Sequence, residues 1–144
     1  TICTRVQLAA SACPARSVYG FARAESPLLD DPVAGPVYLV SSNNELPDLL
    51  ADLKGQVNVR LRGVISSSKR RMKTVFPSVP DVPVSKFVLN MKGGGKGLLV
   101  NSRDLCAGRN TSILGFKAQN GKKRKVKKLP LRTPGCKKAG KRKK

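Results

Sequence analysis

Short apolar segments separated by proline and glycine turns most restrict the fold of this chain. Residues 57–63 read VNVRLRG and alternate strictly, so Val57, Val59 and Leu61 lie on one side and polar residues on the other. Alternation with a period of two residues is typical of a half-buried β-strand. Residues 77–83 contain three prolines, which exclude a helix and favour an extended crossover.

Similar segments recur at intervals of about 8–12 residues, which is typical of β-sandwich proteins. The other expected strands are residues 36–41, 71–76, 86–92, 98–101, 111–118 and 124–131. The sequence therefore predicts an all-β fold, an antiparallel β-sandwich of about seven strands with a basic C-terminal tail. The expected core contains Val59, Leu61, Phe76, Phe87, Leu89 and Leu99.

Two segments admit more than one interpretation. Residues 46–54, LPDLLADLK, fit either a short helix or an edge strand. Residues 93–97, GGGKG, could form a phosphate-binding loop, but no Ser or Thr follows Lys96 and the segment lies between two expected strands. We therefore expect a glycine hairpin turn there.

The positive charge is concentrated at the C-terminus. The 144-residue chain has a formal net charge of +21, and residues 121–144 hold 13 Lys and Arg residues and no acid. Such blocks usually stay solvated and act as interaction tails, and this sign of charge favours polyanions. The expected polyanion-binding residues are Lys122, Lys123, Arg124, Lys125, Lys127, Lys128, Lys137, Lys138, Lys141, Arg142, Lys143 and Lys144. None of the six aromatic residues lies in this block, so we expect binding through charge and not through base stacking.

Four cysteines form two sequence-local pairs. Three connectivities are possible, of which we favour Cys3–Cys13 and Cys106–Cys136, and buried free thiols are the alternative. The sequence has no C-x-x-C, so a zinc ribbon is not expected. An even number of cysteines in a small domain favours an oxidising compartment. We expect a disulfide-linked domain over residues 1–136 and a flexible basic tail over residues 137–144.

The residue types give little support for catalysis. The chain has no histidine, which removes Ser–His and Cys–His pairs and histidine-containing zinc sites. The close carboxylate pairs are Asp30 with Asp31 and Asp48 with Asp52. A calcium site needs about 6–8 oxygen ligands, and Asp30-Asp31-Pro32 is more typical of a turn. We therefore expect no enzyme activity, no metal and no cofactor.

The ends and surface of the chain add three observations. No apolar run approaches the roughly 18 residues that span a bilayer. No signal peptide is visible and the sequence starts at Thr1, which favours a processed chain or a piece of a longer one. Residues 110–112, NTS, fit a glycosylation sequon, which has meaning only in a eukaryotic secretory host.

An ordered set of short motifs covers nearly the whole chain. They are CPARSVYG within residues 12–20, ESPLLD at 25–30, AGPVYL at 34–39, FPSVP at 76–80, KGG at 92–94, GLLVNSRDLC at 97–106, AQNGK at 118–122 and Cys136. In this order they resemble a module of large secreted repeat proteins of actinobacteria. The resemblance implies an extracellular β-rich module, adjoining further modules of a longer chain, with no assigned activity.

These observations lead to two functional hypotheses. The first is a non-catalytic, secreted or cell-surface module with a structural or adhesive role, whose tail contacts an anionic cell-wall polymer or the membrane surface. The alternative is an intracellular nucleic-acid-binding protein that uses the same C-terminus, since KKRKVKK at residues 122–128 is close to a simple nuclear import signal. Non-specific binding to nucleic acid in vitro is expected under either hypothesis.

Overall fold

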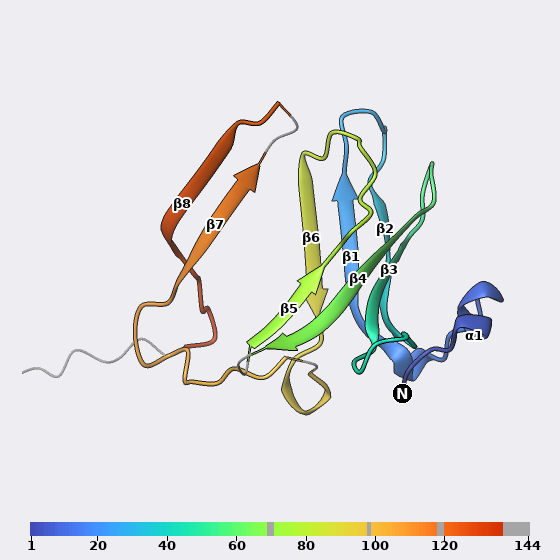
Figure 1. The fold of residues 1–144 in the computed structure, drawn as a ribbon, viewed down its shortest axis with the longest axis horizontal. Helices are drawn as coiled ribbons and strands as arrows, with labels where there is room; N and C mark the ends of the chain where they lie inside the picture. Colours follow the sequence, from blue (N-terminus) through green and yellow to red (C-terminus); the bar gives the residue numbers. More distant parts are fainter. Residues whose placement is uncertain (69–70, 98, 118–119, 137–144) are drawn as a thin grey trace, which may run out of the picture. The chain divides into compact units, whose positions relative to one another are not determined.

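The computed structural model describes residues 1–68, 71–97, 99–117 and 120–136, and these residues form mainly antiparallel strands (Figure 1). The predicted all-β, antiparallel class is confirmed. The chain divides into two compact units, Thr1–Leu99 and Val100–Lys144. The elements of the first unit are α1 (Arg5–Ala9), η1 (Ala15–Ser17), β1 (Val18–Glu25), β2 (Val33–Val40), β3 (Asp48–Leu53), β4 (Val59–Ser68), β5 (Arg71–Val75), β6 (Lys86–Met91) and η2 (Gly94–Lys96). The second unit contains β7 (Thr111–Lys117) and β8 (Lys123–Pro130).

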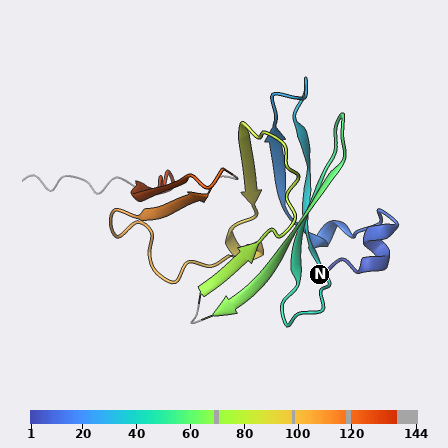
Figure 2. The same cartoon turned by 45° about the horizontal axis from the view of Figure 1, so that its top comes forward.

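Six strands of the first unit form one antiparallel sheet with the order β5-β4-β3-β2-β1-β6. Strands β1 to β5 follow one another as a meander, whereas β6 returns to the opposite edge and pairs with β1. Figures 1 and 2 show that the sheet is strongly curled, with β4 and β5 turned across the direction of β1 and β6. The apolar sides of the six strands thus enclose a core within a single sheet, in place of the two facing sheets of the expected sandwich.

The core follows from the alternation of side chains along the strands. Register pairs place Val37 opposite Ala51 and Ala51 opposite Leu61, so one face of β2, β3 and β4 is continuously apolar. The buried members of this cluster are Ala22, Val33, Val37, Leu39, Leu49, Ala51, Leu53, Leu61 and Ile65. Burial of this apolar surface is the main stabilising contribution to the sheet.

The N-terminal segment covers part of the other face of the sheet. The Cys3 amide donates to the Leu39 carbonyl at 2.8 Å, and the Ser41 amide donates to the Cys3 carbonyl at 2.9 Å. Helix α1 begins with a capping box between Thr4 and Gln7, and the Cys3–Cys13 disulfide closes the segment. Cys3 is buried with Val40 and Leu50, against which Leu8, Cys13 and Tyr38 pack. The favoured pairing is therefore confirmed for this cysteine pair.

Residues 46–54 contain the strand β3, which is an inner strand and neither a helix nor an edge strand. All six of its residues are buried, and it pairs with β2 on one side and β4 on the other. Its tight packing depends on Gly35 in β2, since a Cβ built there would lie 1.8 Å from the Asp52 carbonyl oxygen. The two-sided burial of a six-residue segment explains why its leucines do not alternate.

The predicted core is correct for Leu61, holds in part for Val59 and Phe76, and is wrong for the other three residues. Leu61 is buried, and Val59 and Phe76 pack against the core as partly buried side chains. Phe87, Leu89 and Leu99 are exposed by 45%, 39% and 59%. Phe87 and Leu89 lie on the apolar side of β6, but β6 is an edge strand, and Leu99 lies outside any strand.

The predictions for the later segments hold in part. Strands β7 and β8 coincide closely with the predicted segments, and residues 77–83 form an irregular crossover as expected. The GGGKG segment is not a hairpin turn: Gly94–Lys96 form a 3-10 turn, and Leu99, Val100 and Asn101 do not continue as a strand. Val100 is 90% exposed and pairs with no described strand, so nothing stabilises an extended ladder there. Neither α1 nor β1 is predicted from the sequence.

Candidate polyanion-binding site

The expected basic residues that the structure describes lie on or beside one β-hairpin. Strands β7 and β8 pair antiparallel, with Leu114 opposite Val126, Gly115 opposite Lys125, Phe116 opposite Arg124 and Lys117 opposite Lys123. The Asn120 side chain accepts a hydrogen bond of 3.1 Å from the Lys122 amide at the connection. The hairpin therefore gives a fixed register to a segment that the sequence presents as a run of charges.

This register separates the hairpin into a basic face and a largely apolar face. Side chains of successive strand residues point to opposite faces. Lys123 and Lys125 of β8 therefore share a face with Lys117 of β7, and all three are exposed. We call this set, Lys117, Lys123 and Lys125, the lysine face. The other face carries Leu114, Phe116 and Val126, with Arg124 opposite Phe116.

A β-bulge in β8 sets where this pattern ends. The register shifts between Ser112 and Leu114, because Ser112 pairs with Leu129 while Leu114 pairs with Val126. The additional residue lies in the Lys127-Lys128 pair, and Lys128 has a φ of 62°. A bulge of this kind restores the alternation beyond it. Leu129 thus returns to the same face as Val126, while both bulge lysines remain exposed.

Among the described residues, no lysine of the lysine face forms an ion pair. Asp104 is the last acidic residue of the chain, and its Oδ1 accepts from the Cys106 amide at 2.8 Å. The five ion pairs formed by described residues all lie in the first unit. Lys117 and Lys123 stand directly opposite each other, and like charges in that position destabilise a strand pair. An anion on this face would remove that repulsion.

Hydrogen bonds of Asn110 and a disulfide hold the base of the hairpin. Asn110 precedes β7 and is the only buried residue among the described residues 100–136. Its side chain donates to the Leu105 carbonyl and accepts from Arg103 at 3.2 Å, and its own carbonyl accepts from the Leu131 amide at 2.9 Å. The second favoured disulfide, Cys106–Cys136, is present and joins the segments before and after the hairpin.

The structure describes half of the residues predicted to bind polyanions, and the hairpin register brings one further lysine beside them. Lys122, Lys123, Arg124, Lys125, Lys127 and Lys128 lie on or next to β8 and are exposed. The other predicted residues, Lys137, Lys138, Lys141, Arg142, Lys143 and Lys144, lie outside the described residues. That lysine is Lys117, which is isolated in the sequence and joins the charged run only through its pairing with Lys123 in the hairpin.

The carboxylates considered for catalysis lie in different surroundings. Asp48 and Asp52 project from β3 toward β4, where they accept from Arg62 Nε at 2.7 Å and from Arg60 Nε at 2.9 Å. Asp30 and Asp31 lie in the β1–β2 loop, where Gln56 Oε1 accepts from both of their amides and Gln56 Nε2 donates to Asp30. These contacts orient loops and strands and bring no carboxylate pair together over a cavity.

Comparison with known proteins assigns no family to the chain. It matches no protein-family model, no curated protein and no solved structure. Within the described residues, no three His, Cys, Asp or Glu side chains gather where a metal could bind. The helices of the described part are also too short and too polar to cross a bilayer.

Proposed function

We propose that this protein is a non-catalytic module of the cell surface or the extracellular space, with a structural or adhesive role, whose second unit binds anionic wall polymer or an anionic membrane surface through charge. The observation that carries the proposal is the lysine face, on which three exposed cations share one side of a hairpin of fixed register. Cations gathered on one side of the hairpin raise the local positive potential, which attracts a polyanion.

The distribution of charge supports the assignment to the second unit. Residues 100–144 contain 16 Lys and Arg residues and one Asp, a net charge of +15, whereas residues 1–99 carry +6. A field of this size attracts polyanions and gains free energy by releasing their counterions. Binding would also relieve the repulsion between Lys117 and Lys123.

The dependence of the second unit on a disulfide supports an oxidising location. Both disulfides are compatible with an extracellular protein. The described part of the second unit buries only Asn110, so its fold rests mainly on the hairpin ladder and the Cys106–Cys136 bond. Under reducing conditions the lysine face would lose its geometry.

A competition experiment tests the proposal with a matched control. Fluorescent heparin bound to the full chain is displaced by wall teichoic acid, anionic vesicles or duplex DNA of unrelated sequences. The variant K117Q/K123Q/K125Q neutralises the lysine face, and K54Q/K73Q/K86Q removes the same charge from strands and a strand end of the first unit. We expect each polyanion to lose affinity in the first variant by about tenfold more than in the second.

Two outcomes would contradict the proposal. Equal losses in the two variants would show that net charge acts without the hairpin geometry. Binding to one defined DNA sequence that survives 1 M NaCl would favour the nucleic-acid-binding alternative.

A further inference from the structure

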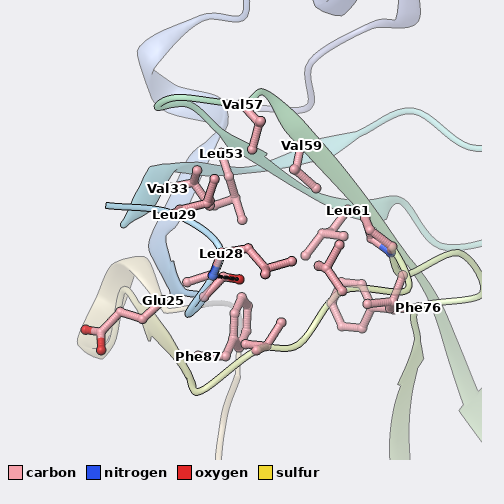
Figure 3. Close-up of a pocket in the computed structure, with 16 residues that line it drawn as sticks. Glu25, Leu28, Leu29, Val33, Leu53, Val57, Val59, Leu61, Phe76 and Phe87 are labelled. Carbon is pink, nitrogen blue, oxygen red and sulfur yellow. Dashed lines mark hydrogen bonds between the residues drawn. The ribbon is translucent and has the colours of Figure 1, made fainter. Parts of the chain in front are cut away.

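The first unit contains an apolar cavity of about 570 Å³ that the polyanion site does not use. Core residues of the sheet, including Val33, Leu53 and Leu61, form its floor. The β1–β2 loop contributes Leu28 and Leu29 as one wall. Figure 3 shows side chains from the loop, the sheet and the crossover converging on this space. The volume lies within the range of about 300–1,000 Å³ found for small-molecule sites.

The crossover from β5 to β6 forms the opposite side of the cavity. Val79, Pro80, Val82 and Val84 line it from this segment. At its start, the Phe76 ring packs over Gly63, where an added Cβ would approach the ring to 2.8 Å. At its end, the Ser85 amide and hydroxyl both donate to the Glu25 carbonyl, at 2.9 and 3.1 Å. The crossover is thus anchored at both ends and held away from the sheet between them.

The lining offers a ligand almost no polar surface. Glu25 and Ser26 are its only polar residues. The Glu25 carboxylate points away from the cavity in Figure 3 and lies near Arg23 and Lys86, at 3.5 and 3.8 Å. The Ser26 hydroxyl accepts from the Leu28 amide at 3.2 Å, and the Ser26 carbonyl accepts from the Leu29 amide. A sugar, nucleotide or peptide backbone would lose its hydrogen bonds to water here without replacement.

The rim of the cavity is unusually apolar for a surface exposed to water. Leu28, Val57, Val79, Val82, Val84 and Phe87 line it and are each exposed by 45% or more. Apolar patches of this kind mark binding sites. The lining extends from this exposed rim to Leu53, which is only 1% exposed. An occupant therefore needs an apolar part that enters the space between sheet and crossover and a remainder that stays at the rim.

We propose that this cavity binds the hydrocarbon chain of a lipid, a single acyl chain inserted between the sheet and the crossover with its polar head at the rim. The chain replaces water against an almost wholly apolar surface, and each buried methylene should strengthen binding by about fourfold. A single acyl chain also presents no polar group along its length. The site is independent of the lysine face, because binding depends on apolar contact and not on charge.

The first test uses neutral probes, so that the charge of the chain plays no part. The full chain is titrated with N-phenyl-1-naphthylamine and the probe is displaced by 1-octanol, 1-decanol and 1-dodecanol. We expect saturable fluorescence, displacement that strengthens with alcohol length, and no weakening at 1 M NaCl. Heparin, which competes for the lysine face, leaves the probe bound. Displacement by heparin, or no saturable signal, would overturn the proposal.

Exposed crossover residues allow a variant that keeps the fold. V82N/V84N makes the crossover side polar and should raise the probe dissociation constant by about tenfold or more, since two apolar contacts are lost. The matched control is V6N on α1, where Val6 is 79% exposed and does not line the cavity. Circular dichroism of each variant verifies the sheet. Equal affinity in V82N/V84N and V6N would overturn the proposal.

A single-tryptophan pair reports the position of the ligand directly. The chain has no tryptophan, so V57W at the rim and V6W on α1 each carry one. A brominated dodecanol, which quenches tryptophan on contact, should quench V57W saturably and V6W only by collision. Vesicles of neutral brominated phospholipid then test the source of the acyl chain. Quenching of V57W by these vesicles indicates a chain taken from a membrane, whereas quenching by the dodecanol alone indicates a free chain. Identical quenching in V57W and V6W by the dodecanol would contradict the assignment.

Discussion

Arg62 donates a hydrogen bond of 2.7 Å from Nε to Asp48, whose carboxylate is completely buried while the arginine side chain is half exposed. Asp48 Oδ1 has no hydrogen-bond partner among the described residues. The ion pair therefore satisfies only one of the two oxygens of this buried carboxylate. Asp52 and Arg60 form a second such pair four residues further along β3, but with an aspartate side chain that is 10% exposed.

The first prediction compares the two arginines. R62A should destabilise the first unit by about 3 kcal/mol, because it leaves the buried Asp48 charge without a partner. R60A should cost about 1 kcal/mol, since Asp52 keeps Lys54 as a partner at 3.8 Å and its side chain is 10% exposed. D48A should cost less than R62A, because it removes the buried charge together with its partner's bond. Urea unfolding of the three variants measures the order, and R60A as costly as R62A would contradict it.

The second prediction concerns close backbone contacts. G35A should destabilise the sheet by more than about 3 kcal/mol, because the new Cβ would meet the Asp52 carbonyl at 1.8 Å and two inner strands would have to separate. G115A is the matched change in β7, where nothing lies within 4 Å. It should be neutral or stabilising by about 0.5 kcal/mol, because alanine loses less entropy than glycine in a strand. Thermal unfolding separates the two, and a destabilising G115A would count against the register of β7.

The third prediction concerns the disulfides. The Cys106–Cys136 bond spans 30 residues and the Cys3–Cys13 bond spans 10, so on the chain-entropy model they stabilise by about 4 and about 3 kcal/mol. C106A/C136A should abolish amide protection in β7 and β8, because their unit has almost no core. C3A/C13A should leave β7 and β8 protected. Hydrogen exchange checks both, and an intact mass four hydrogens higher after reduction confirms the bonds.

The fourth prediction concerns the C-terminal residues 139–144, which lie outside the described residues. Their deletion removes Lys141, Arg142, Lys143 and Lys144 and lies beyond Cys136. Affinity for polyanions should fall while the disulfide and the hairpin persist. Deletion from Lys122 onward should also unfold the second unit, because it removes β8 and one cysteine. Unchanged heparin affinity after the shorter deletion would exclude these residues from the site.

Strand positions with alternating or β-branched residues could be predicted from the sequence, and the others could not. In segments such as 57–63, the alternation of apolar and polar residues alone predicts a strand. Strand β1 does not, because Gly20, Ala22 and Ala24 occupy its apolar face and give no hydrophobic signal. Residues 46–54 are ambiguous, since the spacing of four between Asp48 and Asp52 fits one face of a helix and also one face of a strand. The pairing of these residues with β4 determines that the segment is a strand and not a helix.

The candidate site shows the same limit. The charge run around Lys125 is visible in the sequence, but its division into two faces depends on the register with β7. Lys117 joins the lysine face only through that register. Phe87 and Leu89 have the composition of core residues, yet β6 is an edge strand and Phe87 lines the cavity. Whether such a side chain is buried in the core or exposed at the rim of the cavity depends on the position of its strand in the sheet, which the local sequence does not encode.

The salt dependence of binding to a duplex DNA of arbitrary sequence tests the central claim most directly. Each phosphate that a cation neutralises adds about −0.9 to the slope of log K against log salt concentration. K117Q/K123Q/K125Q should therefore reduce the magnitude of the slope by about 2.7, and K54Q/K73Q/K86Q should leave it unchanged. Equal slopes in the two variants would show that the lysine face does not contact the polyanion and would contradict the proposed function.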